Sequence, residues 1–252
     1  MANINDFFSF QNTIEKISDK EKSQLANYLA LVKAFSRTTN KSIYIIDYQK
    51  KGFEFVSENP LFLCGHTAKE VKDMGYKFYL DYVVERDLNL LLKVNQIGFD
   101  FYDKIPHEER INYTISYHFH IKNKEDKITL VNQKLTPLFL TGEGKIWKAI
   151  CTVSLSTSDD SGNVEITKYG DNKIFRYNLE NDYWSSSAKI QLNERDKQIL
   201  HFSSRGFTIN DIAKELFVSS DTIKFHRKNL FEKLEVSNIA EAIAFSINNK
   251  LV

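Results

Sequence analysis

The sequence predicts an α+β fold, in which an N-terminal antiparallel five-stranded sheet with helices precedes an all-α domain of four helices. Two observations carry this prediction. Between residues 42 and 156, apolar side chains recur at every second position in five segments, which is the period of a half-buried strand. After residue 189 the apolar period becomes helical, and a helix-capping residue opens each of four segments.

Length and charge limit the classes of function. The chain has 252 residues, enough for about two domains, and a formal net charge of only +1. From Lys189 to the end, ten Lys or Arg stand against eight Asp or Glu, a net charge of +2. Nucleic-acid binding would therefore depend on a local patch rather than on a basic field over the whole protein.

The sequence predicts a cytoplasmic protein without a membrane partner. No apolar run approaches the ~20 residues of a membrane helix, and the start has no basic region followed by a cleavage site. Cys64 and Cys151 are the two cysteines, and they lack the CxxC spacing of a zinc or redox site. Two such cysteines fit a reducing compartment.

Residues 1–40 are predicted to form a helical segment. Asp19 suits the start of a helix, and apolar residues follow it at helical spacing. These residues are Leu25, Tyr28, Leu29, Val32 and Phe35. The helix either forms a dimer contact or covers an edge of the next domain.

Residues 41–157 contain the five predicted strands. Strands 42–47 and 52–57 meet at a turn around Lys51-Gly52, and a longer helix starts at about Arg86. Strands 111–121, 127–141 and 145–156 follow, with a bend or an end of pairing expected at Pro137. Alternation places one set of residues of the last strand on a common face: Trp147, Ala149, Cys151, Val153 and Leu155.

Two strands, a helical stretch and three antiparallel strands form an order that resembles a PAS domain. The segment FVSENPLFLCGHTAKEV adds to the resemblance through Asn59 and through a Gly-x-Thr-x-x-Glu run formed by Gly65, Thr67 and Glu70. PAS domains are sensors and dimerisation modules with a cleft between the sheet and the helices. The resemblance implies either a sensor of a small-molecule or protein signal, or a ligand-free dimerisation or docking module.

Four aromatic residues are expected to point toward this cleft, where they either stack a ligand or fill the core: Tyr113, Tyr117, Phe119 and Trp147. The sequence identifies no cofactor.

Isolated histidines and cysteines predict no metal site and no catalytic residues. His118 and His120 share one face of a strand and could reach one metal, but alternation places them on the polar, outward face. His66 is either a ligand contact or part of a helix start, which the following Thr67 favours. Cys64 is expected to be a small buried apolar residue.

Residues 158–188 are predicted to form a connector. DDSGN is turn chemistry, and Gly170-Asp171-Asn172 suits the turn of a candidate hairpin. Trp184 is expected to dock the connector onto one of the two domains, and the three serines that follow it suit a hinge.

Residues 189–252 carry four helix starts. Asn193, Thr208 and Asn238 each precede an acidic residue by three positions, Ser219 starts a further helix, and Gly206 suits a left-handed helix end. The second and third helices form a helix-turn-helix. The predicted inward residues are Leu192, Ile199, Leu200, Ile212, Ala213, Leu216, Val218, Ile223, Leu230, Leu234, Ile243 and Ile247.

The third helix, from Ser219 to Leu234, has the pattern of a DNA recognition helix. Its apolar residues share one face, and polar, cationic and aromatic side chains occupy the opposite face and its flanks. Arg227 lies near the inward face, where its stem can pack while its head reaches outward.

The segments LNERDKQIL, RGFTINDIAKELFVSSDTIKFHRKNLFEKLEV and NIAEAI resemble the LuxR/GerE-type helix-turn-helix. The resemblance rests on residues with fixed spacing: Leu192, Arg195, Leu200, Gly206, Ile212, Ala213, Leu216, Ser219, Thr222, Lys224, His226, Asn229, Lys233, Leu234 and Val236. Asn193, Asp196, Ile209 and Asp221 depart from the family pattern. Of these, Asp221 places a negative charge near the DNA.

The family resemblance implies that the third helix contacts bases and phosphates and that the fourth helix forms a dimer contact. The residues implied to bind DNA are Ser220, Asp221, Thr222, Lys224, Phe225, His226, Arg227, Lys228 and Asn229. We therefore expect a homodimeric regulator of transcription that binds double-stranded DNA under the control of a PAS-like domain. A catalytic role is not expected, because the sequence shows no nucleophile–base pairing, phosphate-binding Gly loop or paired carboxylates.

Overall fold

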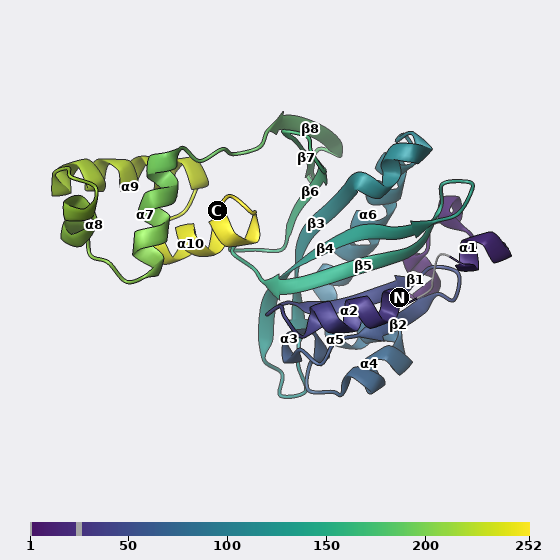
Figure 1. Cartoon of the computed structure of the whole chain (residues 1–252). Helices are drawn as coiled ribbons and strands as arrows, with labels where there is room; N and C mark the ends of the chain where they lie inside the picture. Colours follow the sequence, from purple (N-terminus) through teal and green to yellow (C-terminus); the bar gives the residue numbers. More distant parts are fainter. Residues whose placement is uncertain (1, 24–26) are drawn as a thin grey trace. The chain divides into compact units, whose positions relative to one another are not determined.

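The computed structural model describes residues 2–23 and 27–252, and the chain forms two compact units. The N-terminal unit ends at Ser187, and the C-terminal unit begins at Ala188 (Figure 1). In the described ranges, no helix is both long enough and apolar enough to cross a membrane.

The N-terminal unit is built on an antiparallel sheet of eight strands, in the order β2-β1-β5-β4-β3-β6-β7-β8. The strands are β1 (Ser42–Asp47), β2 (Gly52–Val56), β3 (Tyr113–Lys122), β4 (Ile128–Leu140), β5 (Ile146–Leu155), β6 (Gly162–Lys168), β7 (Lys173–Asn178) and β8 (Tyr183–Ala188). The prediction of five strands is wrong in number. The five predicted strands form the expected PAS-like half of the sheet.

The three additional strands come from the predicted connector. A sheet that ended at β3 would leave that strand with unpaired backbone groups, and β6 pairs with this edge from Tyr113 to His118. Val164 and Ile166 of β6 alternate inward and are buried. The candidate hairpin is therefore part of a longer extension of the main sheet.

Short helices surround the sheet. They are η1 (Ile4–Phe7), η2 (Phe10–Asn12), α1 (Asp19–Ser23), α2 (Tyr28–Ser36), α3 (Pro60–Leu63), α4 (Ala68–Met74), α5 (Lys77–Tyr82), α6 (Glu85–Tyr102) and η3 (His107–Asn112). Asp19 begins α1, and most of the predicted apolar stripe belongs to α2. Leu25 of that stripe lies outside the described residues.

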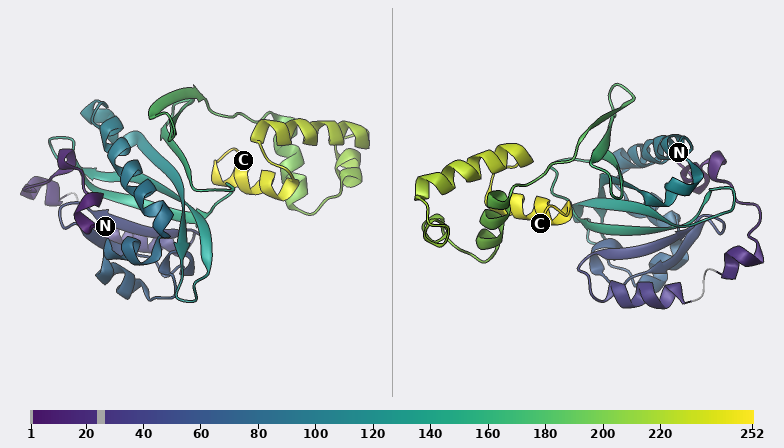
Figure 2. Two further views of the ribbon diagram at one scale, coloured as in Figure 1. Left: turned by 180° about the vertical axis from the view of Figure 1, so that it is seen from behind. Right: turned by 45° about the horizontal axis from the view of Figure 1, so that its top comes forward.

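The two faces of the sheet are covered by different helices (Figures 1 and 2). On one face, α3 to α6 enclose an aromatic core that includes Tyr44, Phe62 and Phe78. On the other face, Val32 of α2 packs against Ile43 and Ile45 of β1. The sheet is therefore buried on both sides over its first strands.

A buried ionic group lies on the α2 side of the sheet. Lys148 of β5 is 1% exposed, and its Nζ donates to Asp47 Oδ2 at 2.6 Å and to Glu54. The Tyr28 hydroxyl of α2 also donates to Glu54. The group ties α2, β1, β2 and β5 together.

An irregularity in β5 changes the direction of Trp147. Phe139 pairs with Lys148 and Leu140 pairs with Ile146, so Trp147 is left over in the register. Such a bulge interrupts the strict alternation of strand side chains. The bend expected near Pro137 lies at the same irregularity, between Pro137 and Leu140.

The C-terminal unit consists of four capped helices: α7 (Glu194–Ser204), α8 (Ile209–Glu215), α9 (Ser220–Leu234) and α10 (Ile239–Asn248). The predicted caps Asn193, Thr208, Ser219 and Asn238 each accept from a backbone N–H of the first turn. Gly206 has the left-handed φ of +84° expected after the first helix. These local predictions are confirmed.

The core of the C-terminal unit contains eleven of the twelve predicted inward residues, either buried or packed against its edge. Ile247 is the exception, with 58% exposure. The Lys233 Nζ of α9 donates to the buried Asp196 carboxylate of α7 at 2.6 Å and joins these two helices.

Candidate DNA-contacting helix and interior cavity

One cap hydrogen bond and three buried side chains fix the orientation of α9 within its unit. Ser219 Oγ accepts from the Thr222 N–H at 3.1 Å, which defines where the helix starts. Ile223, Leu230 and Leu234 are buried against the other three helices. Because these residues share one side of the helix, the opposite side faces outward.

The outward side of α9 carries Asp221, Lys224, Phe225, Lys228 and Asn229, all exposed. The Lys224 Nζ lies 2.9 Å from the Asp221 carboxylate, and the Lys228 Nζ lies 3.8 Å from that of Glu232. Both ion pairs are solvent-exposed and therefore weak, so each ammonium can exchange its partner for a phosphate or a base.

Ser220, Thr222, His226 and Arg227 lie half-buried on the flanks of this face. Ser220 Oγ donates to Asn210 Oδ1 of α8 at 2.7 Å. The Arg227 guanidinium lies 5.6 Å from the centre of the Phe231 ring. Burial lowers the pKa of Arg227, but an arginine remains charged at any ordinary pH.

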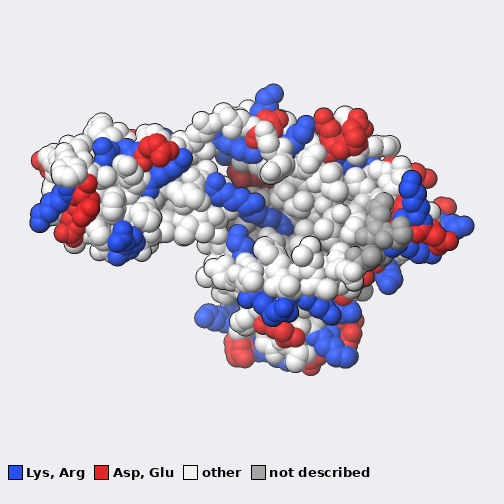
Figure 3. Space-filling view, viewed as in Figure 1, with Lys and Arg blue, Asp and Glu red and all other residues white. Residues whose placement is uncertain are grey.

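The structure therefore places all nine residues implied to bind DNA on one helix, five of them on its outward side and four on its flanks. The charge of this face is mixed. Figure 3 shows acidic and basic side chains together on the displayed side of the C-terminal unit. Lys224 and Lys228 each pair with an acidic residue of α9, Asp221 and Glu232 respectively, so any selectivity must come from individual groups more than from net charge.

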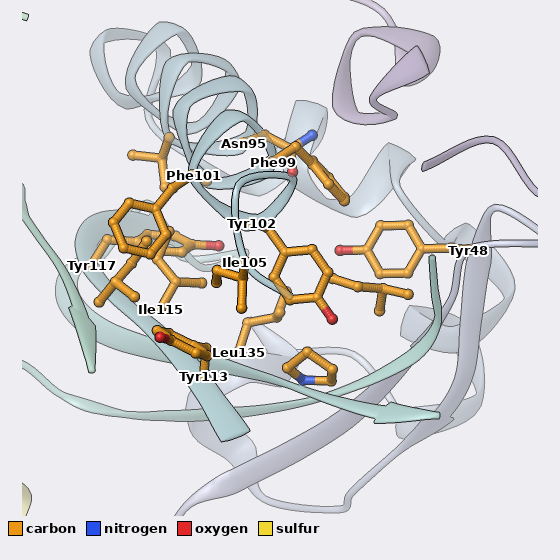
Figure 4. Close-up of a pocket in the computed structure, with 15 residues that line it drawn as sticks. Tyr48, Asn95, Phe99, Phe101, Tyr102, Ile105, Tyr113, Ile115, Tyr117 and Leu135 are labelled. Carbon is orange, nitrogen blue, oxygen red and sulfur yellow. The ribbon is translucent and has the colours of Figure 1, made fainter. Parts of the chain in front are cut away.

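The N-terminal unit contains an apolar cavity of about 60 Å³ between α6 and the sheet (Figure 4). It is lined by Tyr48, Val94, Asn95, Gly98, Phe99, Phe101, Tyr102, Ile105, Tyr113, Ile115, Tyr117, Leu135, Pro137, Ile146 and Ile166. In Figure 4 the Tyr48 hydroxyl points toward the ring of Tyr102. Among the described residues, no acidic or basic side chain lines the cavity.

Two of the four aromatic residues predicted for the cleft, Tyr113 and Tyr117, line this cavity. Phe119 is fully buried in the core beside Tyr79 and Tyr117. Trp147 packs on Phe139, because the bulge in β5 removes it from the alternation on which its prediction depended. Phe119 therefore fills the core, which is one of the two roles predicted for it, whereas the placement predicted for Trp147 is wrong.

Two polar groups that the sequence did not single out lie beside the cavity. Gln133 lines a second cavity of about 30 Å³ that shares Tyr48, Asn95, Tyr117 and Leu135 with the first. Within the described part of the chain, the Tyr102 hydroxyl and Gln133 Oε1 are buried and have no hydrogen-bond partner. Such groups are costly unless something else satisfies them.

A sequence signal for Gln133 existed. Gln133 stands between Val131 and Leu135 in the inward phase of β4, where an apolar residue is expected. Its Nε2 donates to the Tyr117 hydroxyl at 2.5 Å, which leaves its carbonyl oxygen free to accept. Burial raises the pKa of Tyr117, so this hydroxyl stays neutral.

The histidines and cysteines have structural contacts. His118 Nδ1 lies 2.7 Å from Ser156 Oγ, and His120 Nδ1 lies 2.8 Å from the Asp87 carboxylate. His66 precedes Thr67, the N-cap of α4, and burial raises the pKa of Cys64 to about 12. Over residues 2–23 and 27–252, no three His, Cys, Asp or Glu side chains gather as metal ligands would.

The N-terminal unit has the strand order of a PAS-like sheet, and the C-terminal unit contains a capped helix-turn-helix. These features place the chain in the class of helix-turn-helix proteins. Residues 191–246 match the family of bacterial regulatory proteins, luxR family. The C-terminal unit is therefore a luxR-family helix-turn-helix domain.

Curated relatives match the same region. A probable csgAB operon transcriptional regulatory protein of Salmonella typhimurium is 36% identical over 66 residues, which are 26% of this chain and 31% of the relative. The transcriptional activator protein ExpR of Dickeya dadantii is 34% identical over 80 residues, or 31% and 32% of the two chains. The chain thus spans about a third of the length of these relatives.

Among solved structures, the chain is similar to that of a Vibrio cholera VqmA–ligand–DNA complex. The match spans 88% of this chain and 88% of the VqmA chain, at 13% identity and a TM-score of 0.36. The PAS domain of an HTR-like protein from Haloarcula marismortui covers 55% of this chain and all of its own, at 10% identity and a TM-score of 0.35. In this chain, the PAS-like assignment depends on the strand order β2-β1-β5-β4-β3, with α3 to α6 inserted between β2 and β3.

Proposed function

We propose that this protein is a transcriptional regulator that binds double-stranded DNA by placing α9 in the major groove. One observation carries the proposal: α9 is capped and buried along one side, and it presents lysine, phenylalanine, aspartate and asparagine side chains on the other. A helix of this kind holds its side chains in a fixed register against base edges. The proposed contacts are the nine residues named above, which run from Ser220 to Asn229 without Ile223.

The protein is proposed to bind as a homodimer. Helix-turn-helix proteins commonly occupy two half-sites that are related by a two-fold axis. Ile247 of α10 is a large apolar residue that is 58% exposed, and a second copy of α10 would cover it. Such a regulator acts in the cytoplasm, where the DNA is.

The test is selection of duplex DNA from random sequence with the full chain, followed by titration with salt. A two-fold symmetric selected site, with an affinity that falls as salt rises, supports the proposal. Lys224→Ala with Lys228→Ala should weaken binding by at least about tenfold. Unchanged affinity in this variant would remove α9 from the interface.

A matched control exists in the N-terminal unit. Lys69 and Lys77 are exposed lysines paired with Asp73 and Asp81, just as Lys224 and Lys228 are paired on α9. Lys69→Ala with Lys77→Ala changes the net charge equally and should leave DNA affinity unchanged.

The N-terminal unit is proposed to sense a small uncharged molecule in the cavity between α6 and the sheet. The walls are mainly apolar, the Tyr102 hydroxyl of the lining lacks a hydrogen-bond partner, and so does Gln133 Oε1 in the adjoining second cavity. The volume of about 60 Å³ is well below the roughly 150 Å³ that holds benzene in an engineered protein cavity, so the ligand is small or the wall moves. The lining residues offer no nucleophile–base pair, and we propose no catalytic role.

Ligand-observed NMR with isobutanol tests this site. Isobutanol is small, apolar and uncharged, and its hydroxyl can form a hydrogen bond with the Tyr102 hydroxyl, which belongs to a lining residue. Saturation transfer to isobutanol is expected, and none is expected to isobutyrate, which has the same carbon skeleton with a charge. Leu135→Trp should abolish the transfer, because Leu135 lines both cavities.

The side of α6 that lines the cavity is linked to the strands that lead into the C-terminal unit. Phe101 lines the cavity, and its ring centre lies 5.0 Å from that of Phe175 on β7 and 4.9 Å from that of Trp184 on β8. Lys93 of α6 also pairs with Asp182 at the start of β8. A shift of α6 on ligand binding would therefore reach β8, whose last residue precedes the cap of α7 by five positions.

Filling the cavity should change DNA affinity if this route operates. Leu135→Trp mimics occupancy, and Ile128→Trp, at an exposed position of the same strand outside the cavity, is the control. An effect of Leu135→Trp alone supports control by the cavity. Equal DNA affinity in both variants would favour a second function, a dimerisation or docking module, for which the exposed Leu31 and Phe35 of α2 provide an apolar surface.

A further inference from the structure

We propose that Phe225 gives the DNA site a requirement for thymine by packing against the C5 methyl group in the major groove. The inference rests on the proposed function of α9 and deepens it. At 100° per residue, Phe225 lies about 180° from the buried stripe of Ile223, Leu230 and Leu234. It therefore occupies the middle of the outward face, in the N-terminal half of the helix that contacts bases most directly.

The surroundings of Phe225 leave its ring available. The side chain is 62% exposed, and the one aromatic ring near it among the described residues is that of the adjacent His226, with centres 5.9 Å apart. An exposed phenylalanine contributes nothing to the core of this unit, which Ile223 and Leu230 fill from the other side. Its apolar surface is instead free to be covered by a partner.

The chemistry of the face identifies that partner group. Asp221 lies one turn before Phe225, and Lys228 lies one turn after it. A carboxylate accepts from the cytosine amino group and an ammonium donates to guanine, whereas a phenyl ring can do neither. The thymine methyl is the apolar group that the major groove exposes, so it is the group that the ring would contact.

The C-terminal unit contains a matched control. Phe217 lies in the turn before α9, is 95% exposed, and has a left-handed φ of +54°. It resembles Phe225 in residue type and exposure but is not on the outward face of the helix. Phe217→Ala therefore removes an exposed ring without touching the proposed base contact.

The experiment measures the affinity of the full chain for its selected site by fluorescence anisotropy, with each thymine replaced in turn by deoxyuridine. This replacement removes the C5 methyl and leaves base pairing intact. Affinity should fall about fourfold for each thymine that Phe225 contacts, the value of one buried methyl-sized group. A site with 5-methylcytosine at the same position should bind more tightly than a site with cytosine there, because 5-methylcytosine restores the methyl group.

The variants decide which residue detects the methyl. Phe225→Ala should bind the thymine site more weakly and should no longer distinguish it from the deoxyuridine site. Phe217→Ala should keep the full difference. The inference is overturned, and the proposed function left intact, if no deoxyuridine replacement changes the affinity. The same holds if the Phe225→Ala variant still binds the deoxyuridine site fourfold more weakly than the thymine site. Failure to select any sequence overturns both.

Discussion

The two units differ in which polar groups they bury. The N-terminal unit buries Lys148, Asp47 and Asp87, and it leaves polar atoms of Tyr102 and Gln133 without partners beside a cavity. The C-terminal unit has a mainly aliphatic core. Many of its polar side chains act as helix caps or lie on the outward face of α9, and among its described residues it buries no ammonium group, only the polar side chains of Asp196 and Ser246.

This difference separates two ways of building a function. A buried polar group is costly unless it is satisfied, so an interior that keeps such groups is suited to a change of state when a ligand arrives. An aliphatic core has one well-packed state and holds an exposed face in a constant geometry. The comparison predicts that the N-terminal unit depends on buried electrostatics and the C-terminal unit on local capping.

The largest effect is expected at Lys148. Lys148→Ala leaves the buried Asp47 carboxylate without its ammonium partner, which should cost the N-terminal unit about 3–5 kcal/mol. Urea unfolding followed by tryptophan fluorescence reports on this unit, because Trp147 and Trp184 both belong to it.

Lys197→Ala is the control in the other unit. Lys197 also pairs with a carboxylate, that of Glu194, but both side chains are largely exposed, so the cost should stay below about 1 kcal/mol. Its effect is measured by helical circular dichroism. Similar losses in the two variants would remove the contrast between buried and exposed ion pairs.

A smaller effect is expected from acidification. Burial lowers the pKa of His118 to about 4 in the folded unit, against about 6.5 when unfolded. The unfolded chain therefore binds more protons between these values, and the stabilisation, complete above pH 6.5, is lost as pH falls toward 4. The loss should be at most about 3 kcal/mol.

The pH dependence is isolated by comparison with His118→Gln. Other groups titrate equally in both proteins, so the difference in unfolding free energy between them should shrink as pH falls from 7 to 4.5. A difference that is constant over this range would show that His118 is accessible to protons in the folded unit.

The C-terminal unit could be predicted almost residue by residue because its determinants are local. Each helix begins at a side chain that accepts a hydrogen bond from the backbone N–H three residues later, and Gly206 lies where the backbone needs a positive φ. The prediction that Ile247 faces the core was wrong because the helical period shows only which residues share a face. It does not show whether that face meets the core or a second copy.

The N-terminal unit was predicted less completely because its determinants act over long distances. Alternation identified five strands, but the choice of β6 as the partner of β3 depends on an edge that is distant in sequence. Trp147 was misplaced by one extra residue in β5. Tyr102 and Gln133 became candidates only through the cavity that distant segments enclose.

The smallest effect is expected at a helix cap of the C-terminal unit. Thr208→Ala removes the oxygen that accepts from the Asp211 N–H and the hydroxyl that donates to its carboxylate, which should cost about 1 kcal/mol. Helical circular dichroism should report the loss, while tryptophan fluorescence should not change. Thr208→Ser keeps the hydroxyl and should retain most of the stability. If serine were as destabilising as alanine, methyl packing rather than capping would hold the start of α8. The prediction that the C-terminal unit depends on local capping would then be wrong.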